Sequence, residues 1–462
     1  MITILPFLFF LLAIGILLLG YPVAFSLAGV SILFSTICYF FGIFDMGFFE
    51  LIPQRLYGIM INDTLIAIPL FIFMGVMLEK SKISENLLET MGLLFGRLRG
   101  GLGISICLVG ALLAASTGIV GATVVTMGLL SLPIMLKYKY NPALASGLIC
   151  ASGSLGQIIP PSIVLIILGD IMSTANQQAQ LLSGNFSPTA ISVGDLFIGA
   201  LFPGLFLVVV YILLIIIIAI FVPSYAPSVV TKDSVRIKPG ALFMKVIFVL
   251  LPPLFLILAV LGTILAGYST PTEAASVGSV GAMVLAFLNK TLTIKVLKEV
   301  VRATTKINCM VFIILIGSNF FSLVFRGLHG DDIISEFLLS MSGGPNVAFL
   351  IVMLTIFFLG FFLDFFEICF IVVPIIAPIL IQMGFDPIWL GVIIAMNLQT
   401  SFLTPPFGFA LFYLRGVAPD EIKTSDIYRG VIPFIIIQIV VIFFLWEYPE
   451  IITWLPNKVF NN

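Results

Sequence analysis

The length of its apolar runs most constrains what this chain can fold into. Residues 205–222 contain only apolar side chains and one tyrosine, a run long enough to cross the core of a bilayer as a helix. Of the 462 residues, 61% are hydrophobic and 9% charged, whereas soluble domains carry about 25% charged residues. A transmembrane β-barrel would instead need short segments of alternating polarity. The sequence therefore predicts an all-α polytopic membrane protein that lies in the lipid bilayer.

The charged and metal-binding residues argue against several other classes. A net charge of −1 lacks the basic excess expected of a protein with a nucleic-acid partner. The five cysteines are scattered through apolar segments without CxxC spacing, so we interpret them as packed hydrophobes. With His329 as the single histidine, a metal-dependent intramembrane enzyme is hard to build. The N-terminus is apolar for about 40 residues without a basic n-region, so we expect retained spans and not a cleaved signal.

The apolar runs predict ten membrane crossings and two interrupted stretches. Between them, 18 of the 21 lysines and arginines fall in five segments, which the positive-inside rule places in the cytoplasm. The exceptions are Arg55, Arg326 and Lys458. The crossings alternate consistently only if stretches 102–136 and 347–382 each enter and leave on one side, as re-entrant hairpins. The predicted crossings are 4–19, 23–44, 59–78, 143–169, 196–222, 246–266, 273–288, 309–328, 388–414 and 431–448, and the basic segments are 79–101, 137–142, 223–245, 289–308 and 415–430.

Prolines recur at a fixed offset of 245 residues, which predicts an internal duplication. A basic cytoplasmic linker, 223–245, separates the first half, 1–222, from the second, 246–448, and a short tail, 449–462, follows. Each half has five crossings and one hairpin. Because five is odd, the second half starts on the opposite side of the membrane and is inverted relative to the first. Inverted repeats of this kind are typical of secondary transporters, with the site near the midplane. The recurring prolines are Pro133, Pro142, Pro160 and Pro161 in one half and Pro378, Pro387, Pro405 and Pro406 in the other.

A proline pair interrupts one crossing in each half, 143–169 and 388–414. Proline removes a backbone donor and clashes with the preceding turn, and such breaks are tolerated at membrane depth where they line a cavity or lie buried in protein. Freed carbonyls and side-chain oxygens can hold Na⁺, and half-helix N-termini attract an anion. A packing kink with satisfied hydroxyls is the structural alternative. The small and polar residues before the breaks are Ser152, Gly153, Ser154, Gly156 and Gln157 in the first half and Asn397, Gln399, Thr400, Ser401 and Thr404 in the second.

The two hairpins carry different chemistry at their tips. The first has the small polar sequence Ser116-Thr117-Gly118, which suits close approach of the backbone to a ligand. In the second, Asp364 and Glu367 are spaced i,i+3 on one helical face, and acids inside a membrane are costly. Asp364 can be a cation ligand or a helix cap. Both acids can simply meet water if the hairpin is shallow.

Outside these segments the interpretations stay open. Glu273 is a further acid within a crossing, with either a functional or a structural role. Segment 79–101, which contains Arg97 and Arg99, is either an amphipathic helix on the membrane surface or an ordinary solvated basic face. We expect a loop at 170–194, which has no lysine or arginine and either contacts a partner or is slack.

Six motifs spread over nearly the whole chain resemble those of a known family. At this spacing the chain is similar to the large membrane subunit of a tripartite ATP-independent periplasmic (TRAP) transporter. No Walker A sequence is present, in keeping with transport that this chain does not drive with ATP. The motifs are AIPLFIFMG (67–75), GRLRGGLG (96–103), GSLGQIIPPS (153–162), TPTEAASVG (270–278), GFFLDFFE (360–367) and TPPFG (404–408).

The resemblance implies a localisation, partners and a coupling ion. Such proteins lie in the bacterial inner membrane with a small four-helix membrane subunit and a soluble periplasmic substrate-binding protein. They import organic acids, such as dicarboxylates or sialic acid, with a Na⁺ gradient. The resemblance also implies an elevator motion, in which the hairpins and broken helices carry the small organic-anion substrate past a scaffold of outer helices.

The resemblance places the Na⁺ and substrate sites at the hairpin tips and the broken helices. The first tip, STGIVGAT, departs from the Ser-Gly-Ser-Ser type common in the family. The positions carried over for Na⁺ are Ser154, Gly156, Pro160, Asp364, Asn397, Gln399 and Thr400, and those for the substrate are Ser116, Thr117, Gly118, Gln157 and Thr404.

Several hypotheses of function stand side by side at this point. The leading one is Na⁺-coupled uptake of an organic anion that depends on a soluble binder. The same architecture suits a stand-alone Na⁺–carboxylate symporter that needs no binder, and a third hypothesis is a channel lined by both repeats. An intramembrane hydrolase lacks a histidine or paired-aspartate constellation, so we do not expect an enzyme.

Overall fold

The computed structural model describes residues 4–81, 83–95, 98–228 and 239–460, and all regular secondary structure in these ranges is helical. The elements are α1 (Leu5–Leu18), α2 (Val23–Phe40), η2 (Met46–Leu51), α3 (Ile52–Met60), α4 (Asp63–Lys80), α5 (Ile83–Phe95), α6 (Gly101–Thr117), α7 (Val120–Lys137), α8 (Pro142–Ser154), η3 (Leu155–Gln157), α9 (Ile163–Leu182), α10 (Val193–Phe221), α11 (Pro239–Leu265), α12 (Pro271–Leu288), α13 (Ile294–Gly327), α14 (Gly330–Leu339), α15 (Gly344–Leu359), α16 (Phe365–Glu367), η4 (Ile368–Val372), α17 (Val373–Gln382), α18 (Pro387–Leu403), α19 (Phe409–Val417), α20 (Thr424–Glu447) and α21 (Glu450–Phe460).

The length and apolar character of these helices confirm the polytopic all-α prediction. Within the described residues, eight helices are long and apolar enough to cross a membrane. A ninth span is formed if Met46–Met60 and Asp63–Lys80, which meet at an angle of 55°, are taken together. Ten crossings were expected. Seven of these correspond to the spans found, and the other two spans, Val120–Lys137 and Phe365–Gln382, belong to the predicted hairpins. The remaining three are absent within the described residues because crossings 143–169 and 388–414 are each divided into two shorter helices and α1 has only 14 residues.

Several helices extend past the apolar runs that predicted them. Helix α9 continues to Leu182, so the first half of the expected loop 170–194 is helical. Helix α13 begins at Ile294, so most of the basic segment 289–308 is helix as well. Glutamine, lysine and alanine are good helix formers, and they continue a helix beyond the apolar zone that hydropathy detects. Helices α14 and α21 were also unexpected, and α21 occupies most of the tail 449–462.

Two predictions fall partly outside the described residues. Residues 229–238 of the basic linker 223–245 lie outside them, as does Arg97 of segment 79–101. Within the described part of that segment, α5 is helical, and whether it lies on the membrane surface stays a prediction.

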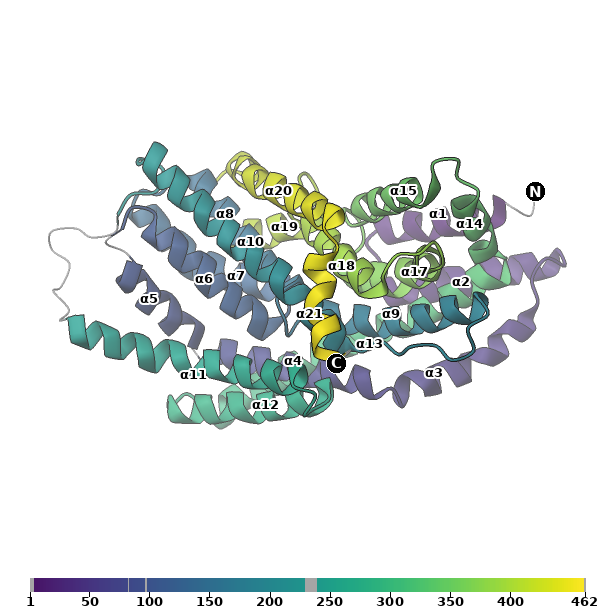
Figure 1. Cartoon of the computed structure of the whole chain (residues 1–462), viewed down its shortest axis with the longest axis horizontal. Coiled ribbons are helices and arrows are strands. Elements are labelled where there is room, and N and C mark those ends of the chain that lie inside the picture. Colours follow the sequence, from purple (N-terminus) through teal and green to yellow (C-terminus); the bar gives the residue numbers. More distant parts are fainter. Residues whose placement is uncertain (1–3, 82, 96–97, 229–238, 461–462) are drawn as a thin grey trace.

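The helices pack around α18, which lies near the middle of the molecule in Figure 1, with α6 and α8 toward one end and α1 and α14 toward the other. Helices α8 and α20 cross with their backbones in direct contact, because a Cβ on Gly147 would overlap the Gly430 backbone and a Cβ on Gly430 would overlap the Ala143 carbonyl. On the opposite side of the view, Ser279 of α12 donates a hydrogen bond to the Leu70 carbonyl of α4, 2.8 Å away. Small and hydroxyl residues therefore set the closest helix contacts, as is common in membranes.

Candidate functional site

The first hairpin closes against the first proline break. Helices α6 and α7 are joined by two residues, of which Gly118 has φ 61°. A Cβ on Gly118 would lie 3.1 Å from the backbone nitrogen of Ile163, which is the first residue of α9. A Cβ on Gly156 would similarly lie 3.3 Å from the Ala114 carbonyl of α6. The structure therefore brings Gly118 and Gly156, two predicted site residues, into one close-packed unit.

The hydroxyls at this break satisfy local backbone groups. Ser162 caps α9: its Oγ accepts a hydrogen bond from the Leu165 N–H at 3.4 Å and donates one to the Gln157 carbonyl at 2.8 Å. Ser154 Oγ donates to the Ala151 carbonyl at 2.9 Å. The role of Ser162 was missed by the sequence analysis, although a serine directly before an apolar helical run is a cap signal. The side chains of the predicted tip residues Ser116 and Thr117 lie outside the described part of the structure.

The second hairpin is fastened to α18 by buried hydrogen bonds. Asn397 Nδ2 donates to the Met353 carbonyl of α15 at 2.7 Å, and Ser401 Oγ donates to the Phe357 carbonyl at 2.9 Å. Because Asn397 and Ser401 are one helical turn apart, they form a two-point attachment between the helices. Asn397, predicted as a Na⁺ ligand, thus uses its amide nitrogen in packing.

The tip of the second hairpin is a helix cap. Asp364 Oδ1 accepts a hydrogen bond from the Phe365 N–H at 2.7 Å, and Glu367 Oε2 accepts one from the Asp364 N–H at 3.2 Å. The Asp364 side chain also faces the Glu367 backbone N–H, which completes a capping box, the structural alternative that the sequence left open for Asp364. Glu273 is exposed and forms the same kind of cap on α12, with Thr270.

The second proline break lies between α18 and α19. Two predicted residues there bond to the turn before them: Thr400 Oγ1 donates to the Met396 carbonyl at 2.9 Å and Thr404 Oγ1 to the Thr400 carbonyl at 2.8 Å. The ring of Phe407 packs on Phe362 of the hairpin, with centroids 5.3 Å apart. The sequence analysis did not detect this aromatic contact, because ring packing between distant segments leaves no local pattern.

Two predicted site residues, Gln157 and Gln399, are fully buried without hydrogen bonds. Neither atom of the Gln157 amide has a hydrogen-bond partner among the described residues. The Gln399 amide has none there at normal hydrogen-bond distance, although the Tyr211 hydroxyl lies nearby. Gln157 ends η3 at the first break, and Gln399 lies on α18 one turn before the second. Buried polar atoms nearly always have a partner, so unpaired amides of this kind are candidates for contact with water, an ion or a ligand. Their neutral oxygens suit a hard cation such as Na⁺.

Two helical hairpins packed against two broken helices, within a bundle of membrane-length helices, define a class of polytopic transport protein. The chain belongs to the family described as the tripartite ATP-independent periplasmic transporter, DctM component, whose model matches residues 10–451. It is accordingly a TRAP transporter large permease and a multi-pass protein of the inner membrane, and its family consists of transport permeases and not of enzymes.

Curated relatives align with nearly the whole chain. The large permease protein of a C4-dicarboxylate TRAP transporter from Vibrio cholerae is 29% identical over 97% of each chain. The sialic acid TRAP transporter large permease protein of the same species is 27% identical over 96% of each. The ectoine TRAP transporter large permease protein of Halomonas elongata is 29% identical over 97% of this chain and 98% of its own. The crystal structure of the YdaH transporter of Alcanivorax borkumensis shares the fold, with a TM-score of 0.60 at 13% identity over 89% of this chain and 88% of its own.

Proposed function

We propose that the chain imports a small organic anion together with Na⁺, and that it receives this substrate from a soluble periplasmic binding protein. The relatives named for C4-dicarboxylates, sialic acid and ectoine support a carboxylate-bearing substrate. A small four-helix membrane subunit completes the transporter. The family membership supports both partners, which are proposals for this chain.

The buried, unpaired amides of Gln157 and Gln399 are the observation that carries this proposal. Each lies within a turn or two of a proline pair, where freed backbone carbonyls supply further neutral oxygens. We assign these amides and carbonyls to Na⁺, with Ser154, Gly156 and Thr400 nearby in the same segments. For Gln157, this proposal replaces the substrate-binding role that the resemblance implied. The hydroxyls of Ser154 and Thr400 donate to backbone carbonyls, and their oxygens keep lone pairs with which to bind a cation.

The duplication and the elevator motion form part of the same proposal. Helix α8 begins at Pro142 and α18 at Pro387, so these two helices start 245 residues apart, at the spacing of the proline pairs. Each helix ends before its proline break after a similar length, 13 residues in α8 and 17 in α18. We propose that these two units are inverted repeats that move together and carry substrate and Na⁺ across the membrane.

The proposal is tested by uptake into proteoliposomes that contain this chain and its small subunit. Labelled succinate, N-acetylneuraminate and ectoine are offered with and without an inward Na⁺ gradient and the cognate binding protein. Accumulation that requires both supports the proposal. Accumulation without the binding protein identifies a stand-alone symporter, and fast, non-saturable flux identifies a channel. Either result contradicts the proposal.

The Na⁺ site is tested by the variants Gln157→Leu and Gln399→Leu. We expect each to raise the Na⁺ concentration for half-maximal uptake about tenfold, which corresponds to about 1.4 kcal/mol. Asn176→Leu is the matched control, since Asn176 is also buried but both atoms of its amide are paired: Nδ2 donates to the Thr189 carbonyl at 2.8 Å and Oδ1 accepts from Gln180 Nε2 at 3.0 Å. An equal effect of all three variants would show that the glutamines act only through packing.

A further inference from the structure

A polar cleft of about 370 Å³ lies apart from the proline breaks, between α3, α4 and α13 on one side and α9 with η4 and α17 on the other. Its volume falls within the range of about 300–1,000 Å³ that is usual for small-molecule sites. Two arginines line it, together with one carboxylate and several uncharged polar side chains. The polar lining includes Arg55, Asn62, Asp170, Asn319, Ser322 and Arg326.

The cleft contains basic residues that the topology does not explain. Only three of the 21 lysines and arginines lie outside the basic segments, and two of these, Arg55 and Arg326, line this cleft. On α13, Arg326 is 20 residues beyond Lys306 of the basic end, which places it about 30 Å away along the helix. That distance is about the thickness of the hydrocarbon core, so the cleft lies toward the non-cytoplasmic face.

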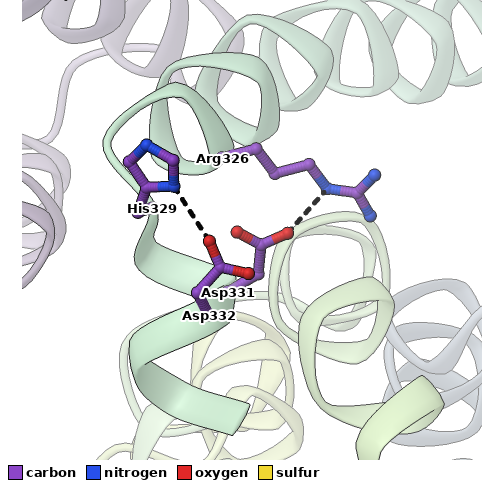
Figure 2. A network of polar contacts seen from close by, with 4 residues as sticks. All are labelled: Arg326, His329, Asp331 and Asp332. Atoms are coloured by element: carbon purple, nitrogen blue, oxygen red, sulfur yellow. Dashed lines mark hydrogen bonds and ion pairs between the residues drawn. The ribbon is translucent and has the colours of Figure 1, made fainter. Parts of the chain in front are cut away.

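Both arginines have fewer acceptors than their charge requires. Arg326 makes an ion pair with Asp331, with 3.7 Å between Nε and Oδ2, but its buried Nε completes no hydrogen bond within the described residues (Figure 2). The neighbouring Asp332 faces His329 instead, 2.9 Å from Nδ1 (Figure 2). Among the described residues, Arg55 has neither an ion pair nor a side-chain hydrogen bond.

Within the described part of the chain, the carboxylate in the cleft forms no ion pair with either arginine. Asp170 accepts a hydrogen bond from Asn62 Nδ2 at 2.9 Å, which holds it on the α4 side. Ser318, Ser322 and Arg326 are spaced four residues apart on α13, so they follow one face of that helix. The cleft thus combines two poorly compensated guanidinium groups with hydroxyl and amide groups, a set that suits an anion with further polar substituents.

We propose that this cleft is an entry site for the substrate, in which Arg55 and Arg326 bind a carboxylate that arrives from the non-cytoplasmic side. A guanidinium group binds a carboxylate through two parallel hydrogen bonds, and two such groups facing one cleft repel each other until an anion lies between them. The proposal rests on the organic-anion function above. It places the first contact with the substrate carboxylate outside the proline breaks where Na⁺ is assigned. Neither break segment contains an arginine, so neither can offer a guanidinium group to the carboxylate.

The charge preference of the cleft is measured without transport. Ser322→Cys is introduced in a Cys309→Ser background, because Cys309 is exposed and the other four cysteines are buried. The full chain in nanodiscs is treated with an anionic sulfonatoethyl and a cationic trimethylammonioethyl methanethiosulfonate reagent. We expect at least a fivefold faster reaction with the anionic reagent, and slowing of this reaction by succinate but not by succinamide. Ser340→Cys in the same background, at an exposed position, is the control and should show neither effect.

The arginines are then replaced one at a time. Arg55→Gln and Arg326→Gln should each abolish both the preference for the anionic reagent and the protection by succinate. Arg55→Lys should keep the preference for the anionic reagent and weaken the protection by succinate. Arg302→Gln, at the opposite end of α13 and exposed, should change nothing. Equal rates for the two reagents, or Gln variants that behave like Arg302→Gln, would overturn the proposal.

The two proposals fail in distinguishable ways. If no organic acid is accumulated but the cleft still prefers the anionic reagent and succinate protects it, the entry site stands and the transport proposal is wrong. If Na⁺-coupled uptake is intact in Arg55→Gln and Arg326→Gln, the entry site is wrong and the transport proposal stands. If one arginine variant does not fold, as judged by gel filtration and thermal unfolding, the other decides.

Discussion

The two proline breaks have similar sequences and different surroundings. Every residue from 151 to 169 is buried, and the first hairpin reaches this break through glycines that leave no room for a Cβ. At the second break, Pro406 and Phe407 are exposed, and the hairpin reaches it through phenylalanine rings. The first contact depends on the absence of side chains. The second combines one such glycine, Gly360, and hydrogen bonds from α18 with large side chains at the surface. We therefore expect the first break to tolerate change far less than the second.

The largest effect is expected at the first hairpin tip. Gly118→Ala places a Cβ against Ile163 and forces a positive φ, so unfolding free energy should fall by about 2–4 kcal/mol. Gly42→Ala is the matched control, because Gly42 has a similar positive φ, of 69°, but nothing lies within 4 Å of its Cβ position. Thermal unfolding in detergent measures both. Equal losses would mean that backbone strain and not the contact with α9 dominates.

A smaller effect is expected at the second break. Phe407→Ala removes ring contacts with Phe361 and Phe362, at centroid distances of 6.5 and 5.3 Å, and should cost about 1–2 kcal/mol of stability. Phe186→Ala, at a ring that is 86% exposed, should leave stability unchanged. A loss at Phe407 as large as that of Gly118→Ala in the same unfolding assay would remove the contrast between the breaks.

The smallest change in stability is expected at the second tip, where Asp364 is both a cap and a proposed Na⁺ ligand. Asp364→Ser keeps a capping oxygen and should unfold like the wild type, whereas Asp364→Ala should lose about 1 kcal/mol. If the carboxylate also binds Na⁺, both variants should raise the Na⁺ requirement for uptake about tenfold, or about 1.4 kcal/mol. Asp386, which caps α18, provides the control pair, with the same stability pattern and no change in Na⁺ requirement. A normal Na⁺ requirement in Asp364→Ala would leave Asp364 a cap alone.

The parts of the fold that depend on local sequence were predictable. Apolar runs predicted the spans, and glycine and proline predicted interruptions near Gly118, Pro160 and Pro405, where the structure ends its helices. The ends of α9 and α13 were not predictable from hydropathy, because their outer turns are polar and helical at once. Hydropathy describes where lipid ends, and a helix does not have to end there.

The candidate site divides in the same way. Gln157 and Gln399 were found because polar residues next to a proline pair are conspicuous in an apolar crossing. The contacts of Asn397 and Asp364 were not predictable, because the same residue type can serve as an ion ligand or as a packing or capping group. The arginine cleft was missed because Arg55 and Arg326 are 271 positions apart in the chain and meet only through the packing of α3 and α13.

The crossing of Gly147 and Gly430 determines which helices can move separately. Two helices in backbone contact through glycines cannot slide by a turn, because each would meet the side chains that flank the other glycine. Any displacement of α8 must therefore carry α20 with it as a rigid pair. In the elevator motion proposed above, the boundary of the moving part then runs outside α20, and a crosslink between α20 and the surrounding helices should stop the motion as effectively as one placed at a hairpin.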